Sequence, residues 1–256
     1  MMLVTALVDI DRHSRNFEEH YIESLKKVIA VNHKIAIYGD WKYRNIFKGD
    51  NVLYYRLDKE ILEKHILFEK IKEITKNEDW LGQSEWMRNS IIASPYYILL
   101  TNLKSQLLTS VSQVFNDDHT YWVDSGIYGS YNLKESFSEF NFFNIPKDKF
   151  FITSFSYKRD DQPEIHGLSK QYITKECGYV PDYVCRATVF GGTRMQIAQI
   201  DRLFYQELQK SLENSVVGTE EAIYTILSCK YSDLFHRFEM PTGDIYNFLQ
   251  SIKERQ

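Results

Sequence analysis

Residues 3–8 (LVTALV) form a short apolar run, followed by a helical pattern over residues 17–31 and a second apolar run, KIAIY, at residues 34–38. Short runs of Val, Ile and Leu are typical of strands buried on both faces, and apolar residues spaced three and four apart are typical of an amphipathic helix. The order strand, helix, strand therefore predicts the start of a parallel sheet covered by helices. A third apolar run at residues 52–55 extends the pattern.

The rest of the chain continues to alternate between helical and strand-like segments. Helical patterns cover residues 58–75, 89–114 with an interruption at Ser94-Pro95, 193–213 and 220–229. Strand-like runs cover residues 120–123, 150–155 and 183–190. No repeat of fixed period and no Gly-, Ser- or Pro-rich linker divides the sequence. We therefore expect one α/β domain with a mostly parallel central sheet flanked by helices.

The composition excludes several classes of protein. The chain has 256 residues, and its 31 Lys and Arg against 35 Asp and Glu leave no surplus of positive charge for coating nucleic acid. Hydrophobic residues make up 43%, which argues against intrinsic disorder. Three cysteines, Cys177, Cys185 and Cys229, show no CxxC spacing and predict reduced thiols rather than disulfides or a zinc site. With no export signal and no membrane span, a cytoplasmic location is expected.

Carboxylates at predicted strand ends are the main chemical signal. The Walker, GxGxxG, GxSxG and HExxH motifs are absent from the sequence. Asp9, Asp40 and Asp124 each follow a predicted strand, and ligands of open α/β sheets bind at the carboxyl ends of the strands. Carboxylates there can bind Mg²⁺ or Mn²⁺, but Asp also ends strands as a turn former or helix cap. The small pair Ser125 and Gly126 after Asp124 leaves room for a ligand.

Three further groups have both a functional and a structural interpretation. Gly191 and Gly192 lie between a predicted strand and a predicted helix, where they form either a ligand-binding turn or an ordinary connection. Glu220 and Glu221 follow Thr219 at a predicted helix start, so they are either functional acids or part of a capping motif. His236 alone is a metal ligand or a packing histidine.

Several stretches resemble one known family. They are TALVDI at residues 5–10, LTNLK at 100–104, YWVDSGI at 121–127 and the segment from ATVFGGT to DLFHRF at 187–238. In this order they are similar to the HtrL/YibB family of candidate glycosyltransferases and, more broadly, to the GT-A glycosyltransferase fold. The resemblance implies one GT-A-like, Rossmann-like domain over residues 1–256. Residues 1–126 would form its nucleotide-binding half, and residues 127–256 the half for the acceptor and donor sugar.

The resemblance also implies a donor site. The first strand would face the base and ribose, Lys104 would be the basic residue near the donor, and the glycine pair would lie beside the donor sugar. The residues expected at the donor are Thr5, Ala6, Leu7, Asp9, Arg12, Asp40, Lys104, Ser125, Gly126, Gly191 and Gly192.

The metal site implied by the resemblance departs from the family pattern. Asp124 matches the place of the Asp-x-Asp motif that binds Mn²⁺ or Mg²⁺, but Asp124-Ser125-Gly126 has one carboxylate only. His236 resembles the C-terminal histidine that completes the metal site in glycogenin-like enzymes. Asp9-Ile10-Asp11 is literally Asp-x-Asp, but it follows the first strand, where the fold binds the base. GGTR at 191–194 is similar to the loop of sugar-nucleotide pyrophosphorylases, which belongs at the first strand.

The implied reaction is metal-assisted glycosyl transfer from a nucleotide-diphosphate sugar, with UDP as the expected nucleotide, to a glycan or lipid-linked glycan. Glu220 or Glu221 would act as a general base, which implies inversion, or would bind donor-sugar hydroxyls, which is compatible with retention. Both roles remain open. Candidates for acceptor contact are Trp86, Arg88, His166 and the aromatic segment 137–143, although core packing explains the aromatic residues equally well.

Two alternatives to a transferase remain. A sugar-nucleotide pyrophosphorylase fits the α/β pattern but lacks the N-terminal glycine loop. A catalytically silent nucleotide-sugar-binding or scaffold protein of the same fold fits the single carboxylate at position 124. Peripheral attachment to the inner face of the membrane also stays open, although for residues 243–256 packing onto the domain is favoured over membrane contact.

Overall fold

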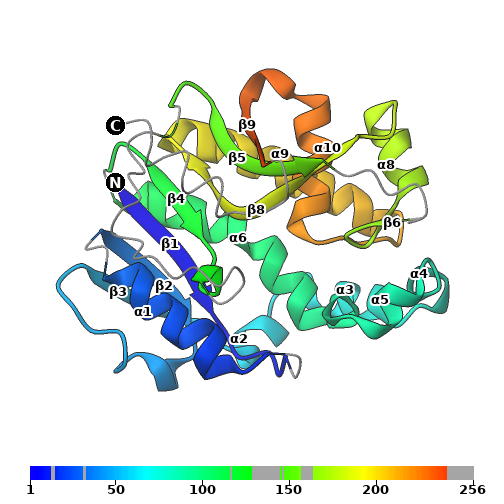
Figure 1. Cartoon of the computed structure of the whole chain (residues 1–256). Helices are drawn as coiled ribbons and strands as arrows, with labels where there is room; N and C mark the ends of the chain where they lie inside the picture. Colours follow the sequence, from blue (N-terminus) through cyan, green and yellow to red (C-terminus); the bar gives the residue numbers. More distant parts are fainter. Residues whose placement is uncertain are drawn as a thin grey trace.

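The computed structural model describes residues 1–12, 15–30, 33–115, 117–128, 145, 147–156 and 164–240. A seven-stranded sheet with the order β3-β2-β1-β4-β8-β5-β9 runs through the molecule (Figure 1). Its strands are β1 (Met2–Leu7), β2 (Lys34–Gly39), β3 (Val52–Arg56), β4 (Thr120–Val123), β5 (Phe150–Ser156), β8 (Tyr183–Gly192) and β9 (Phe235–Met240). A separate hairpin consists of β6 (Glu164–Ile165) and β7 (Leu168–Ser169).

Strand direction decides which strand ends meet. Strands β1, β2, β3 and β4 are parallel, and β9 is parallel to β5. Among the described strands of the sheet only β8 runs antiparallel to its neighbours, β4 and β5. The expected mostly parallel α/β sheet is confirmed. The carboxyl ends of β1 and β4 therefore meet at one edge, while β8 ends at the opposite edge.

Helices cover both faces of the sheet (Figure 1). The π-helix η1 (Glu18–Ile22) leads into α1 (Glu23–Ile29). The 3₁₀ helices are η2 (Trp41–Tyr43), η3 (Ile91–Ala93) and η6 (Ser232–Leu234). The remaining helices are α2 (Lys59–Glu63), α3 (Phe68–Thr75), α4 (Glu78–Leu81), α5 (Glu85–Asn89), α6 (Pro95–Val114), α8 (Lys170–Cys177), α9 (Arg194–Glu213) and α10 (Glu220–Lys230). In the described part of the chain, no helix is long and apolar enough to span a membrane.

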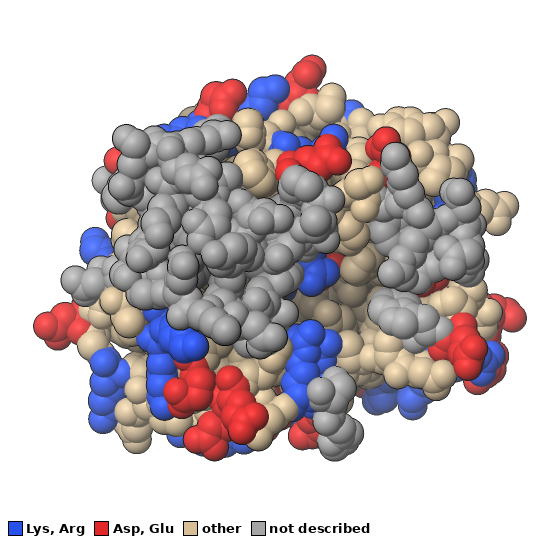
Figure 2. All heavy atoms as spheres, viewed as in Figure 1, with Lys and Arg blue, Asp and Glu red and all other residues tan. Residues whose placement is uncertain are grey.

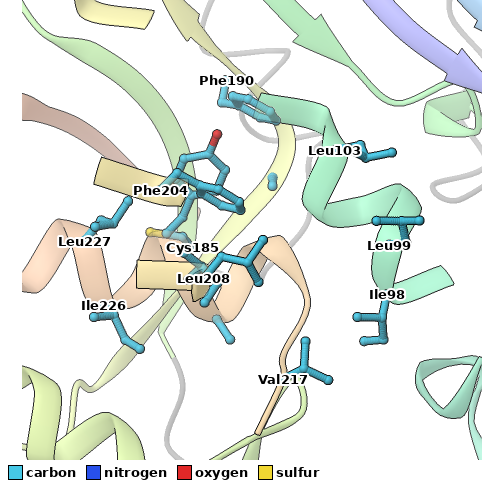
Figure 3. Close-up of a cluster of buried hydrophobic side chains, with 14 of the residues drawn as sticks. Ile98, Leu99, Leu103, Cys185, Phe190, Phe204, Leu208, Val217, Ile226 and Leu227 are labelled. Carbon is cyan, nitrogen blue, oxygen red and sulfur yellow. The ribbon is translucent and has the colours of Figure 1, made fainter. Parts of the chain in front are cut away.

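Alternating side chains of the strands fill two cores. Met2 and Val4 of β1 face the larger core, to which α6, α9 and α10 contribute. Figure 3 shows part of it, with Phe190 and Phe204 near Leu103. Leu3 and Leu7 of the same strand face the second core, formed with α1. Because both faces of the sheet are buried, the strand sequences are continuous apolar runs and do not alternate between apolar and polar residues.

Some elements differ from the sequence-based expectation. The helical pattern over residues 58–75 is divided into α2 and α3. The interruption expected at Ser94-Pro95 is present: α6 begins at Pro95, and Ser94 accepts a hydrogen bond from Tyr97 N. The strand expected to end at residue 190 continues through Gly191 and Gly192. Strand β9, helix α8 and the β6–β7 hairpin were not expected.

Candidate active site

A cavity of about 310 Å³ opens where β1 and β4 end. Its walls come from the end of β1 and the segment after it, from α6, from the middle of β8, from the β6–β7 hairpin and from the start of α10. Figure 2 shows a hollow on this face of the molecule with basic side chains beside it. The position agrees with the rule that ligands of open α/β sheets bind beyond the carboxyl ends of the strands.

Lys104 of α6 is the centre of one charged cluster in the cavity. Its Nζ lies 2.7 Å from Asp124 Oδ1 and 2.6 Å from Glu220 Oε1. The same ammonium donates to the carbonyl of Ala187 at 3.2 Å, and Trp122 Nε1 donates to Asp124 Oδ1 at 2.8 Å. An ammonium has three hydrogens, and three protein acceptors use them here. Lys104 therefore holds the two carboxylates in place rather than reaching toward a ligand.

The buried lysine keeps its charge. Burial by itself lowers the pKa of Lys104, but the adjacent Asp124 and Glu220 carboxylates outweigh burial and raise the pKa above its usual value. Burial raises the pKa of Glu220, and Lys104 opposes this rise. The cluster thus places a permanent positive charge between two carboxyl groups.

A second cluster joins Glu221, His166 and Arg186. Glu221 Oε2 lies 2.9 Å from His166 Nδ1, and Glu221 Oε1 lies 3.6 Å from Arg186 Nη1 and accepts from Ala187 N at 3.3 Å. Burial would raise the pKa of Glu221, but Arg186 and His166 outweigh it and lower the pKa to about 2. Burial would lower the pKa of His166, and the Glu221 carboxylate outweighs it and raises the pKa. Glu221 is therefore a carboxylate that stabilises a protonated imidazole.

Two arginines add positive charge on the β1 side of the cavity. Arg12 donates to the hydroxyl of Tyr21 at 3.1 Å and lies over the ring of Tyr97. Arg15 Nη1 lies 2.6 Å from His20 Nε2. Burial, followed by Arg15 and Arg12, lowers the pKa of His20 to about 4, so its ring is neutral and can accept this hydrogen bond.

Among the described residues that line it, the cavity therefore carries an excess of permanent positive charge. Arg12, Arg15, Lys104 and Arg186 face Asp124, Glu220 and Glu221. This balance suits an anionic ligand that also presents hydroxyl groups.

The structure brings most of the expected site residues to this cavity. Those that line it are Ala6, Leu7, Arg12, Lys104, Asp124, Ser125, Gly126, Glu220 and Glu221. Asp9 and Asp40 lie beside each other at the ends of β1 and β2, where the Asp9 backbone N–H donates to Asp40 Oδ2 at 2.7 Å. They are not among the residues that line the cavity, and Thr5 is buried within β1.

Gly191 and Gly192 lie at the opposite edge of the sheet from the cavity. The expectation that they lie beside the donor sugar is therefore corrected. Gly191 pairs with Tyr121 and Gly192 with Thr120, at the amino end of β4, whereas Asp124 follows its carboxyl end. Asp124 is three positions along the chain from Tyr121, the partner of Gly191, which corresponds to about 10 Å of strand. A Cβ at Gly191 would lie 2.2 Å from the carbonyl oxygen of Thr120, and φ is +152°. Close packing against β4 accounts for this glycine.

His236 is not brought to Asp124 either. It pairs with Phe151 on β9, and β9 lies three strand positions from β4, a separation of about 14 Å. Within the described ranges, no group of three His, Cys, Asp or Glu side chains is arranged to hold a metal ion. The expected pair of Asp124 and His236 as ligands of one ion does not fit this sheet order.

The expected acceptor-contact residues are only partly placed. His166 lines the cavity, whereas Arg88 forms an ion pair with Glu78 and is not among the lining residues. The Trp86 side chain and residues 137–143 lie outside the described part of the structure. Sequence reasoning missed Arg15 and Arg186. A charged residue inside the apolar run YVCRATVF was the available signal for Arg186.

Comparison with known proteins gives a family and a fold. The profile of a family described as "Bacterial protein of unknown function (HtrL_YibB)" matches residues 2–252. A search of curated proteins found no match. Among solved structures, core-mannan synthase A from Aspergillus fumigatus, in a Mn/GDP-form, is similar with a TM-score of 0.56 at 13% identity. The similarity covers 93% of this chain and 72% of that one.

Proposed function

The chain belongs to the HtrL_YibB family, and from this membership, the glycosyltransferase-like fold and the cavity we propose that it transfers glycosyl groups from a nucleotide-diphosphate sugar. The observation that carries the proposal is the cavity at the ends of β1 and β4, in which four cationic side chains face three carboxylates. A diphosphate needs the cations, and sugar hydroxyls need the carboxylates as hydrogen-bond acceptors. The acceptor is a glycan or glycoconjugate in this proposal.

Arg12 and Arg15 are the residues that we assign to the diphosphate. Both line the cavity beside the end of β1, where Arg12 contacts the hydroxyl of Tyr21 and Arg15 contacts the imidazole of His20. Phe17 and Tyr21 line the same side and offer aromatic faces to the base or ribose. Positive side chains there would stabilise the charge that grows on the departing diphosphate.

For a divalent cation, Asp124 fits and His236 does not. The Asp124 side chain is 34% exposed, and both side-chain contacts made to it by the described residues end on Oδ1. Mg²⁺ and Mn²⁺ are commonly held by one or two carboxylates together with substrate phosphates, so one carboxylate is enough when the diphosphate is present. We propose that Asp124 holds such a cation, which would neutralise charge on the diphosphate.

Glu220 and Glu221 divide their roles in this proposal. Glu220 accepts from Lys104 and faces the cavity beside Asp124, where it would accept hydrogen bonds from donor-sugar hydroxyls. Glu221 is committed to His166 and Arg186 on the opposite side of the cluster. Neither carboxylate is the first choice for a general base, because each already faces a cation.

A thermal-shift panel tests the proposal. UDP, GDP, CMP and their sugar conjugates are added with and without Mn²⁺; GDP is included because the similar mannan synthase is in a Mn/GDP-form. A ligand at about 100 times its Kd adds about 2.7 kcal/mol to the free energy of unfolding. We expect UDP-linked sugars to raise the melting temperature most, and CMP, with one phosphate, to have little effect.

Two variants make the panel specific. Asp124→Asn is expected to lose the Mn²⁺-dependent part of the shift, while Asp233→Asn, an exposed aspartate of η6, keeps it. A folded wild-type protein whose melting temperature responds to no nucleotide diphosphate would contradict the proposal.

A further inference from the structure

We propose that the imidazole of His166 accepts the proton of the acceptor hydroxyl during transfer, and that Glu221 is the positioning residue for this imidazole. The inference rests on the proposed function and names the group that its chemistry still requires. It also commits the reaction to inversion at the anomeric carbon, because a protein base deprotonates an acceptor that attacks opposite the leaving group.

The backbone fixes where the imidazole lies. His166 and Gly167 are the two central residues of the β6–β7 hairpin, with φ values of +49° and +99°. Positive φ at both positions is characteristic of tight two-residue hairpins, and it is uncommon for a residue other than glycine. Strained backbone at a cavity wall is a feature of functional sites, where surrounding contacts hold it.

Two hydrogen bonds from other parts of the chain, and one within the hairpin itself, hold this turn. Thr219 N donates to the carbonyl of His166 at 2.8 Å, and Trp80 Nε1 donates to the carbonyl of Gly167 at 3.0 Å. Gly167 N donates to Glu164 Oε2 at 3.2 Å. The backbone that carries His166 is thus fixed to the start of α10 and to α4, and His166 lines the cavity.

Glu221 determines which ring nitrogen carries the proton. Its Oε2 lies 2.9 Å from Nδ1 of His166. In the neutral ring this carboxylate keeps the hydrogen on Nδ1, so the lone pair that can accept a proton is on Nε2. The same carboxylate stabilises the imidazolium that forms after proton transfer. A carboxylate behind a histidine is a recurrent arrangement for a general base.

The other acids of the cavity are less suited to the role. Glu221 accepts hydrogen bonds or charge contacts at both oxygens, and its pKa is lowered to about 2. Glu220 is paired with the Lys104 ammonium. Asp124 is the residue proposed for the cation.

The proposed step balances as a displacement. The acceptor oxygen attacks the anomeric carbon, and the bond between that carbon and the phosphate oxygen breaks, with its electron pair leaving on the diphosphate. The acceptor O–H bond breaks at the same stage, and its proton moves to His166 Nε2. Water can replace the acceptor, which gives slow hydrolysis of the donor by the same route.

The charged groups around the ring set the pH dependence. His166 faces Glu221 of α10, Arg186 of β8 and Glu164 of β6. Burial lowers the pKa of His166, and Glu221 outweighs burial so that the pKa lies above the usual 6.5. Below this pKa the ring is protonated and cannot act as a base, so kcat is expected to rise with pH and then level off.

Hydrolysis of the nucleotide sugar that the wild-type protein binds provides the test, with kcat measured across pH and donor affinity measured by calorimetry. His166→Asn is the main variant, because Asn tolerates the left-handed backbone but has no basic nitrogen. We expect kcat to fall about 100-fold or more and donor affinity to stay unchanged. The rise of kcat with pH at the acidic end of the profile, the acidic limb, should disappear. Glu221→Gln should shift that limb to lower pH, since the stabilising charge is lost. His65→Asn, in the connection between α2 and α3, is the matched control.

Two results would overturn the inference and leave the proposed function intact. One is a His166→Asn protein that keeps wild-type kcat and its acidic limb. The other is retention of configuration in the sugar first released, as seen by NMR. A folded wild-type protein that neither binds nor hydrolyses any UDP- or GDP-linked sugar would instead overturn the proposed function, and this inference with it.

Discussion

At the scale of single residues, Lys104 is the side chain on which the site depends most. It is buried, and its ammonium joins Asp124 and Glu220 by contacts of 2.7 and 2.6 Å. Removing one member of a buried ionic cluster leaves the others without compensation, which costs more than the cluster contributes as a whole. Lys104 is therefore a structural requirement for two residues of the proposed site.

We predict that Lys104→Met lowers the free energy of unfolding by about 3 kcal/mol, because two carboxyl groups are left facing an apolar side chain. Urea unfolding measures this change. Lys72→Met is the control, since Lys72 forms an exposed pair with Glu69, and such pairs contribute about 0–1 kcal/mol. Equal effects of the two substitutions would show that Lys104 is not holding the carboxylates.

A second prediction separates the structural role of Gly191 from a ligand-binding role. Gly191→Ala places a Cβ against the β4 backbone and should lower stability by roughly 3 kcal/mol. Gly178→Ala is the matched control, because φ is +80° there but nothing lies within 4 Å of an added Cβ. Its expected cost is about 1 kcal/mol. Folded Gly191→Ala protein should bind the donor normally, and a selective loss of binding would contradict this account.

At the scale of elements, the β6–β7 hairpin connects the fold to the proposed chemistry. Trp80 of α4 donates its indole N–H to the carbonyls of Gly167 and Val217, each at 3.0 Å. One side chain thus fixes both the hairpin and the segment before α10. The hairpin carries His166, and the second segment leads into α10, in which Glu221 lies.

We predict that Trp80→Phe lowers stability by about 1–3 kcal/mol, since two buried carbonyls lose their donor. Donor hydrolysis should fall in kcat with little change in KM, because the hairpin is less firmly placed. Trp41→Phe, at an exposed tryptophan of η2, should change neither. Steady-state kinetics with chemical denaturation of both variants measures the two effects, and an unchanged kcat in a destabilised Trp80→Phe protein would contradict the link.

Element by element, the sequence predicted what depends on local pattern. The apolar runs located β1, β2, β3 and β4 within a residue or two, and the helical pattern over residues 193–213 located α9. The direction of β8 could not be predicted, because an apolar run has the same pattern whether its neighbours are parallel or antiparallel. That direction is why Gly191 and Gly192 lie away from the cavity. Likewise, nothing local in FHRFEM shows that β9 is an edge strand three positions from β4.

At the scale of the whole molecule, charge is distributed unevenly. The chain carries a net charge of -4, yet the cavity collects Arg12, Arg15, Lys104 and Arg186. Separate motifs in the sequence predicted that Lys104, Asp124, Glu220 and Glu221 belong to one site. In the structure all four residues line one cavity. Sequence reasoning missed Arg186, whose contact with Glu221 depends on how β8 packs against α10.

This distribution predicts that donor binding depends on salt. A diphosphate held by Arg12 and Arg15 should bind more weakly as ionic strength rises toward about 1 M, where the Debye length is about 3 Å. Calorimetry at several salt concentrations measures the slope. Arg12→Gln should bind more weakly and show a shallower slope, and an affinity that does not respond to salt would contradict charge-based recognition.

Turnover of a nucleotide sugar is the direct test of the proposed glycosyl transfer in the cavity. Wild-type and Asp124→Asn proteins are incubated with UDP- and GDP-linked sugars, and the nucleotides are separated to follow release of the diphosphate. We expect the wild-type protein to release the diphosphate from one donor, and Asp124→Asn to release it about 100-fold or more slowly. A wild-type protein that binds a nucleotide sugar tightly but releases no diphosphate would contradict the proposed transfer and identify a silent binding protein.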